Sequence, residues 1–390
     1  MIKIINRKRK FRIYQREELA LTFTKILVRK NIENLSAYVS GKPIEEVQRE
    51  LGLESIVKLA SNENPYGCSP LAKESMLIEM EQTSFYPEGM APSLAEKLAR
   101  KLNIKQDNII LGNGSDEVIR LLTRTYIQQN DEVIMADVTF PRYETNVLID
   151  GGTPVKIPLI NGVHDLQGMY EAITEKTRMI FVCNPNNPTG TIVQKEKLRS
   201  FIEKVPKHIL LIVDEAYYEY VEDEDYLETL PFLNTHSNLV ILRTFSKIYG
   251  LAALRIGYGL MDVSIIQELI KVKEPFNTNR LAQAAAFASL DDPTFVAQCA
   301  RKNEEGRRYL ENELSEMGLT FFPSHANFIM VKLNHPSRYV FEELLKQGVI
   351  IRSGHLLGYE NTIRVTIGTP LENERFIKSL QNVINKTLST

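Results

Sequence analysis

The most informative segment of this chain is Leu242-Arg243-Thr244-Phe245-Ser246-Lys247-Ile248-Tyr249-Gly250-Leu251-Ala252-Ala253-Leu254-Arg255-Ile256-Gly257. The apolar run from Leu239 to Leu242 predicts a buried strand that ends at small polar residues. Lys247 lies among these residues, after the hydroxyls of Thr244 and Ser246 and before Arg255. A lysine held in a pocket can lose its proton and form a Schiff base with a carbonyl cofactor, and hydroxyls beside a fixed cation suit a phosphate. Taken alone, the segment also allows an ordinary solvated lysine on a loop.

The composition argues against several classes of function. The 390-residue chain has 25% charged residues and a formal net charge of -2, which gives no electrostatic footprint for nucleic acid. No apolar run reaches the length of a membrane span. Cys68, Cys183 and Cys299 are far apart, which favours reduced thiols in the cytoplasm over a disulfide framework or a cysteine-based zinc site. The six histidines show no metal-binding spacing, so no metal site is predicted.

The order of elements predicts an α/β protein with two folded parts. Between residues 108 and 260, short apolar strands alternate with helical segments, which predicts a mostly parallel sheet covered by helices on both faces. After residue 279, two helices precede short strands and a final helix at 371–388, which predicts a smaller α+β domain. We expect a long helix near residues 264–274 to join the two parts.

The domain organisation follows from this order. Residues 1–30 are rich in Lys and Arg but lack the uninterrupted apolar core of a signal peptide, so we expect a basic extension outside the fold. Residues 31–66 form an N-terminal segment, residues 67–275 the large domain, and residues 276–390 the small C-terminal domain.

Polar residues follow several of the predicted strands, and ligands of open α/β sheets lie at the carboxyl ends of strands. Gly114, Ser115 and Asp116 follow a strand and open a helix, so backbone N–H groups and the helix dipole could bind an anion. A tight turn with an ordinary helix cap is the alternative interpretation.

Asp214 comes directly after five apolar residues and is therefore expected to be buried. A buried carboxylate needs a cationic partner, and the protonated ring nitrogen of pyridoxal phosphate is one such partner. Tyr217 could bond a hydroxyl of the same ring. The alternatives are a helix-capping Asp and a Tyr that only packs in the core.

Four further residues are candidates for ligand contacts. Asn187 lies in a proline-rich turn, Asn184 to Gly190, which can aim its amide at a ligand oxygen or can simply be a rigid turn. Phe140 can lie flat on a planar ring or belong to the core. Arg352 and Arg364 can recognise a carboxylate or a phosphate, although arginines near strand ends are usually solvated.

Taken together, these motifs resemble the fold-type I pyridoxal-phosphate-dependent aminotransferases, from residue 31 to the C-terminus. The family motifs are Asn187-Pro188-Thr189-Gly190, Asp214-Glu215-Ala216-Tyr217, and Ser246-Lys247 with Arg255. Within the family, the chain is similar to the enzymes that act on histidinol phosphate. That similarity lies in Lys58-Leu59-Ala60-Ser61-Asn62-Glu63-Asn64-Pro65-Tyr66-Gly67, Leu35-Ser36-Ala37-Tyr38 and Arg364-Val365-Thr366-Ile367-Gly368.

The resemblance implies a role for each matching residue. Lys247 would carry pyridoxal 5'-phosphate as a Schiff base and shuttle the substrate proton, and Asp214 would keep the ring nitrogen protonated. Asn187 and Tyr217 would bond the ring oxygen, and Phe140 would stack on the ring. The cofactor phosphate would be bound by Gly114, Ser115, Asp116, Thr244, Ser246 and Arg255, with Tyr66 of the partner subunit. The substrate would be bound by Arg364, Arg352, Asn187 and Tyr38.

The resemblance also implies an activity and a partner. It implies a cytoplasmic homodimer with shared active sites, in which residues 31–66 pack with the small domain and the partner. Its reaction would be a ping-pong transfer from L-histidinol phosphate to 2-oxoglutarate, giving imidazole-acetol phosphate and L-glutamate, in histidine biosynthesis. The sequence predicts no nucleic-acid or membrane partner.

Other activities stay open at this stage. An aromatic amino-acid aminotransferase for tyrosine and phenylalanine, or an enzyme with both activities, would use a similar site. A threonine-phosphate decarboxylase of the same fold type is a further alternative. A non-catalytic regulator that binds pyridoxal phosphate usually carries a DNA-binding helix-turn-helix, for which residues 1–30 are too short. A dinucleotide-binding dehydrogenase fits poorly, because the glycine fingerprint is missing.

Overall fold

The computed structural model describes residues 28–33, 35, 37 and 42–388. The chain divides into two units, residues 1–37 and residues 38–390. The first unit contains the short helix α2 (Lys30–Glu33), and the two sheets and the helices that cover them belong to the second unit. Tyr38 and most of the predicted basic extension lie outside the described residues.

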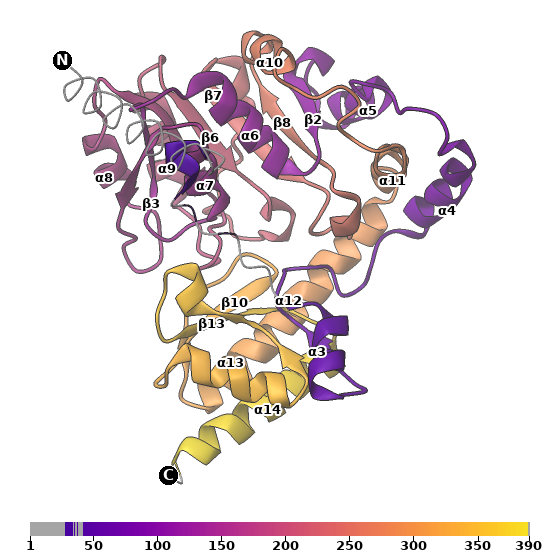
Figure 1. Cartoon of the computed structure of the whole chain (residues 1–390), viewed down its shortest axis with the longest axis vertical. Helices are drawn as coiled ribbons and strands as arrows, with labels where there is room; N and C mark the ends of the chain where they lie inside the picture. Colours follow the sequence, from indigo (N-terminus) through magenta and orange to yellow (C-terminus); the bar gives the residue numbers. More distant parts are fainter. Residues whose placement is uncertain (1–27, 34, 36, 38–41, 389–390) are drawn as a thin grey trace, which may run out of the picture. The chain divides into compact units, whose positions relative to one another are not determined.

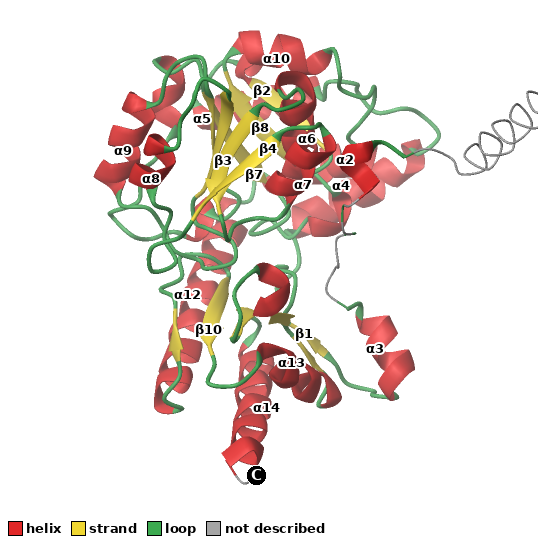
Figure 2. Ribbon diagram, turned by 60° about the vertical axis from the view of Figure 1, so that its left-hand side comes forward, coloured by secondary structure: helices red, strands yellow, loops and turns green. Residues whose placement is uncertain are grey.

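A seven-stranded sheet forms the centre of the larger part (Figures 1 and 2). Its order is β2-β8-β7-β6-β5-β3-β4, and all neighbours pair in parallel except β8, which runs antiparallel to both β2 and β7. The strands are β2 (Ile109–Gly112), β3 (Glu132–Ala136), β4 (Thr153–Ile157), β5 (Thr177–Cys183), β6 (Leu210–Asp214), β7 (Leu239–Thr244) and β8 (Gly257–Met261). The predicted α/β fold with a mostly parallel sheet is therefore confirmed.

Helices cover both faces of this sheet because successive strand residues point to opposite faces. Ile180 and Val182 belong to one apolar cluster, which includes residues of α5, α9 and α11, whereas Met179 and Phe181 belong to a second cluster with residues of α6, α7 and α10. The helices are α4 (Pro70–Glu79), α5 (Pro92–Leu102), α6 (Ser115–Tyr126), α7 (Arg142–Ile149), α8 (Leu166–Glu171), α9 (Lys195–Lys204), α10 (Val263–Ile270) and α11 (Arg280–Ser289).

The smaller part is built on a four-stranded antiparallel sheet of order β12-β13-β10-β9. A separate parallel pair joins β1 to β11. These strands are β1 (Val57–Lys58), β9 (Thr320–Phe321), β10 (Phe328–Lys332), β11 (Val349–Ile350), β12 (Arg352–Ser353) and β13 (Thr362–Thr366). The accompanying helices are α3 (Ile44–Leu51), α12 (Pro293–Glu316), α13 (Ser337–Lys346) and α14 (Pro370–Leu388). Residues of α12, α13 and α14 share an apolar cluster with this sheet.

The prediction of a long helix near residues 264–274 that joins the two parts is wrong. In the structure, α10 spans only Val263–Ile270, and its buried residues Ile265, Ile266 and Leu269 pack on the large sheet. The long helix is α12, with 24 residues, which lies between the two sheets in sequence (Figure 1). α11 packs against α4 and α5, so its apolar face belongs with the larger part. The domain boundaries given above stay a prediction.

None of the helices in the described part of the chain combines the length and the apolar content needed to cross a bilayer.

Candidate active site

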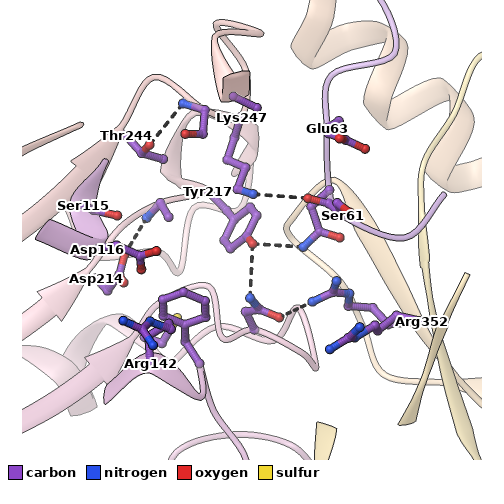
Figure 3. Close-up of a pocket in the computed structure, with 18 of the residues that line it drawn as sticks. Ser61, Glu63, Ser115, Asp116, Arg142, Asp214, Tyr217, Thr244, Lys247 and Arg352 are labelled. Atoms are coloured by element: carbon purple, nitrogen blue, oxygen red, sulfur yellow. Dashed lines mark hydrogen bonds between the residues drawn. The ribbon is translucent and has the colours of Figure 1, made fainter. Parts of the chain in front are cut away.

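A cavity of about 420 Å³ lies where the carboxyl ends of the parallel strands meet the loop that follows β1 and the edge of the small sheet (Figure 3). Strand register brings these ends together, because Cys183 pairs with Asp214 and Asp214 pairs with Leu242 across β5, β6 and β7. The predicted site residues that line the cavity are Ser115, Asp116, Phe140, Asn187, Asp214, Tyr217, Thr244, Ser246, Lys247, Arg255, Arg352 and Arg364. Residues far apart in sequence thus form one site.

Lys247 follows the end of β7 and points its amine into the cavity (Figure 3). Its Nζ lies 3.5 Å from the carbonyl oxygen of Ser61 and 5.6 Å from the centre of the Tyr217 ring. Burial first, and then the positive charges of Arg364 and Arg255, lower the pKa of Lys247 to about 8. An amine with this pKa is partly unprotonated near neutral pH and can act as a nucleophile.

Asp214 is the last residue of β6 and is 3% exposed. It accepts a hydrogen bond of 2.6 Å from the Tyr143 hydroxyl and one of 3.1 Å from the Ala216 N–H. Burial raises the pKa of Asp214 to about 6, and these hydrogen bonds oppose that rise. No cationic side chain pairs with Asp214 among the described residues, so a cationic ligand atom would suit this carboxylate.

A hydrogen-bonded chain crosses the cavity beside Lys247. The Tyr217 hydroxyl accepts hydrogen bonds from Asn62 Nδ2 at 3.0 Å and from Asn187 Nδ2 at 3.4 Å. Arg364 donates to Asn187 Oδ1 at 2.6 Å and to the carbonyl oxygen of Ala60 at 2.8 Å. The amide of Asn187 is therefore held with its nitrogen toward Tyr217 and its oxygen toward Arg364.

The Arg255 guanidinium lies at the start of α6, beside groups that could bind an anion. Arg255 donates to Ser246 Oγ at 3.3 Å and lies 3.8 Å from Asp116. A Cβ atom at Gly114 would lie 2.5 Å from the Arg255 guanidinium, so only glycine allows this approach. Arg255 itself has a φ of 56°, an uncommon conformation that places its side chain beside the helix start.

Arg352 and Arg364 lie opposite each other on the paired strands β12 and β13. Both are buried, with 5% and 7% of their surface exposed. Two adjacent guanidinium groups can bind a phosphate or carboxylate through several charge-assisted hydrogen bonds.

Two of the predicted residues that the structure describes, Gly114 and Tyr66, do not line this cavity. Gly114 contributes only through the close approach of Arg255. Tyr66 lines a different cavity of about 430 Å³, where Lys302 Nζ lies 4.4 Å from the centre of its ring. Tyr38 lies outside the described residues.

The sequence reasoning missed several residues of the site, including Tyr143, Asn62, Ser61, Glu63, Cys183 and Arg142. Tyr143 and Arg142 could have been suspected because they follow Phe140 within three residues, on the first turn of α7. No sequence pattern indicated the contact of Asn62 with Tyr217, which depends on packing of a distant loop.

The sequence is similar to those of known aminotransferases over most of its length. The chain is 46% identical over 359 residues to the histidinol-phosphate aminotransferase of a Geobacillus species, covering 92% of this chain and 98% of that protein. It is 48% identical to the enzyme of the same name from Bacillus licheniformis, covering 92% of this chain and 99% of the relative.

A solved structure also matches. The histidinol-phosphate aminotransferase from Sinorhizobium meliloti, in complex with pyridoxal-5'-phosphate, gives a TM-score of 0.86 at 25% identity, covering 94% of this chain and all of that chain. The model of the family "Aminotransferase class I and II" matches residues 54–380, which include every cavity-lining residue described above. The chain therefore belongs to the aminotransferase class I and II family.

Proposed function

We propose that this protein is a pyridoxal-phosphate-dependent transaminase that transfers the amino group of L-histidinol phosphate to 2-oxoglutarate in histidine biosynthesis. The observation that carries the proposal is one cavity lined by Lys247, by the buried carboxylate of Asp214 and by two arginines on paired strands. The relatives named histidinol-phosphate aminotransferase, at 46–48% identity over 92% of the chain, support the choice of substrate.

The residues of the cavity fit the cofactor. Asp214 is buried without a cationic partner among the described side chains, which suits a protonated pyridine nitrogen. The glycine at position 114 leaves room for the Arg255 guanidinium beside the start of α6, which suits a phosphate. The other groups proposed for the phosphate are Ser115, Asp116, Thr244 and Ser246. Phe140 is available to stack on the ring, and Asn187 and Tyr217 to bond its oxygen.

The protein's own residues prepare the reaction. When bound, the cofactor supplies an aldehyde and an electron-withdrawing ring that stabilises negative charge at the substrate Cα. Lys247 Nζ would hold the cofactor and would accept the proton from the substrate Cα. Its lowered pKa makes the free amine available near neutral pH. Asp214 would hold a proton on the ring nitrogen.

Arg364 and Arg352 provide the anion site of the substrate. Their adjacent guanidinium groups suit the phosphate of histidinol phosphate, and Arg364 suits a carboxylate of 2-oxoglutarate in the second half-reaction. Asn187 is already fixed by Arg364, so its amide is positioned for the substrate as well. Tyr38 completes this site in the proposal.

The proposed enzyme is a cytoplasmic homodimer with shared sites. Tyr66 lines a separate cavity in its own chain, which leaves its hydroxyl available for the phosphate site of a second copy. Large apolar side chains are exposed near the same segment, including Leu77, Ile78, Phe85 and Tyr86, at 67%, 66%, 65% and 78% exposure. Exposed apolar side chains of this size favour an interface. All three cysteines are free thiols, as a reducing compartment requires.

Hybrid dimers test the shared site. Lys247→Ala and Tyr66→Ala each inactivate both sites of a homodimer, but a hybrid of the two variants has one intact site. Mixing equal amounts of the unfolded variants and refolding them should restore about a quarter of wild-type activity. No recovery would contradict the shared site while leaving the reaction itself untouched.

The reaction is tested by the absorbance of the bound cofactor. L-Histidinol phosphate should change this absorbance, and 2-oxoglutarate should restore it. Equal responses to tyrosine and phenylalanine would indicate dual specificity. Release of carbon dioxide from threonine phosphate, without consumption of 2-oxoglutarate, would indicate the decarboxylase instead. A protein that binds no pyridoxal phosphate, or that binds it without modification of Lys247, would overturn the proposal.

A further inference from the structure

Arg142 is a cation in the active-site cavity that the proposed reaction does not yet use. Its side chain lines the cavity (Figure 3) and makes no hydrogen bond or ion pair with the part of the chain that the structure describes. By contrast, Arg255 is bonded to Ser246 and Arg364 to Asn187. A guanidinium left without a protein partner in a ligand cavity is available to bind an anionic ligand.

The carboxylates of the cavity do not neutralise Arg142. Glu63 forms an ion pair of 2.7 Å with Lys58, Asp116 lies 3.8 Å from Arg255, and Asp214 accepts the Tyr143 hydrogen bond. The described residues that line the cavity include five cationic side chains, Arg142, Lys247, Arg255, Arg352 and Arg364, against these three acidic ones. Because Arg255 is assigned to the cofactor phosphate and Lys247 to the cofactor itself, Arg142, Arg352 and Arg364 remain for anionic groups of the substrates.

The position of Arg142 in α7 does not explain its charge by a stabilising effect on the helix. It is the first residue of α7, directly after Phe140 and Pro141. A cation at a helix N-terminus is unfavourable by about 0.3–1 kcal/mol, because the helix dipole is positive there. The charge is therefore not explained by stability of the helix.

Arg142 and the paired arginines approach the cavity from different elements. Arg352 and Arg364 belong to the small sheet, whereas Arg142 belongs to the helix that follows β3. Figure 3 shows Arg142 and Arg352 at opposite sides of the cavity. Two separated cation positions match a ligand that carries an anionic group at each end.

The two proposed substrates differ in this respect. Histidinol phosphate has one anionic group, its phosphate, and ends in an imidazole. 2-Oxoglutarate and glutamate have a carboxylate at each end, and a carboxylate enclosed without a cation is strongly disfavoured. When one carboxylate occupies Arg364, the other needs a second cation.

We propose that Arg142 binds the side-chain carboxylate of 2-oxoglutarate and glutamate while Arg364 holds their other carboxylate, an inference that rests on the proposed function. With histidinol phosphate bound, the same guanidinium donates a hydrogen bond to the acceptor nitrogen of the neutral imidazole. Arg142 is then a specificity-determining residue that lets one cavity accept an acidic and an uncharged side chain in turn.

Arg142→Gln tests the inference in steady-state kinetics of the cofactor-loaded enzyme. The KM for 2-oxoglutarate should rise about 10- to 100-fold, as expected for loss of a hydrogen bond to a charged group. The KM for histidinol phosphate should change by less than about threefold, because a neutral acceptor loses less. Arg338→Gln is the matched control, since Arg338 is an exposed residue on the first turn of α13 and lies outside the cavity.

A binding measurement tests the same point without turnover. Wild-type protein titrated with glutarate and with butyrate, followed calorimetrically, should prefer the dicarboxylate, and Arg142→Gln should lose that preference. Arg142→Lys should retain part of it, which guards against a folding defect in the glutamine variant. The inference is overturned if wild-type protein shows no preference, if the variant keeps it, or if histidinol phosphate is weakened more than 2-oxoglutarate. If histidinol phosphate is not a substrate at all, the proposed function fails, but the glutarate preference still decides the role of Arg142.

Discussion

The Tyr143 hydroxyl donates a hydrogen bond of 2.6 Å to Asp214 Oδ2, which joins the first turn of α7 to the end of β6. Both side chains are buried, and the Tyr143 ring is fixed by stacking on Phe181 with a centroid distance of 4.4 Å. Burial raises the pKa of Asp214 to about 6, and this hydrogen bond opposes the rise. The ionisation of Asp214 near neutral pH therefore depends on Tyr143.

Replacing Tyr143 with Phe should raise the pKa of Asp214 further. Asp214 is charged above its pKa, so the affinity of the apoprotein for pyridoxal phosphate should fall as pH drops through about 6. In Tyr143→Phe this midpoint should move upward, and the affinity at pH 7 should fall about tenfold, as expected for loss of a hydrogen bond to a charged group. The dissociation constant measured across this pH range checks the prediction. Tyr170→Phe, a change at an exposed residue of α8, serves as the control. An unchanged midpoint would show that Tyr143 does not act through Asp214.

Covalent capture of pyridoxal phosphate by the apoprotein should speed up with pH and level off above about 8. The reason is that only the unprotonated amine of Lys247 is a nucleophile, and the pKa of Lys247 is about 8. Arg364 is the first of the charges that lower this pKa, so Arg364→Gln should move the midpoint upward. Arg338→Gln should leave it in place, because this exposed residue does not line the cavity. Stopped-flow absorbance at a series of pH values measures the rate. A wild-type midpoint near 10.5 would contradict the lowered pKa.

Much of the fold could be predicted because strand and helix periodicities are local properties of the sequence. The helix predicted to open at residues 114–116 is α6, and Asp214 is buried at the end of β6, after the five apolar residues that predicted its burial. The antiparallel pairing of β8 with both neighbours could not be read from the same patterns, since it depends on which strands meet in space. The helix expected near residues 264–274 ends at Ile270 in the structure, because the point where its packing on the sheet stops is not a local property of the sequence.

The site was predictable where its residues follow strands. Asp214 is the last residue of β6, Asn187 and Lys247 follow the ends of β5 and β7, and parallel strands bring such ends together. Asn62 was not predictable, because its bond to Tyr217 joins residues 155 positions apart. Arg142 was missed for another reason: an arginine that opens a helix is usually solvated, and only the cavity shows otherwise.

Replacing Gly250 with Ala should disrupt the loop that carries Lys247. Gly250 has a φ of 70°, and a Cβ atom there would overlap the backbone carbonyl of Gly67. Gly318 has a nearly identical φ of 71° but open space around it, so Gly318→Ala isolates the conformational cost of about 1–2 kcal/mol. Gly250→Ala should lose clearly more stability than this control and should also bind less pyridoxal phosphate. Thermal unfolding and cofactor content measure the two effects. Equal losses in both variants would mean that the contact with Gly67 is not constraining.

Removing one partner of the buried ion pair between Glu215 and Arg243 should destabilise the protein much more than removing both partners. Arg243 on β7 donates to Glu215 at 2.8 and 2.9 Å, and Thr229 also donates to this carboxylate, so the pair ties the segment after Asp214 to the strand before Lys247. Arg243→Met leaves a buried carboxylate without its cation and should lower the free energy of unfolding by about 3–5 kcal/mol, whereas the double variant with Glu215→Leu should recover most of that loss.

Lys271→Ala, which breaks an exposed pair with Glu268, should change the free energy of unfolding by less than about 1 kcal/mol. Urea unfolding of the cofactor-loaded protein measures all three. If the double variant is as unstable as Arg243→Met, the loss comes from packing of the Arg243 side chain over Tyr218, 3.8 Å from its ring centre, and not from the unpaired charge.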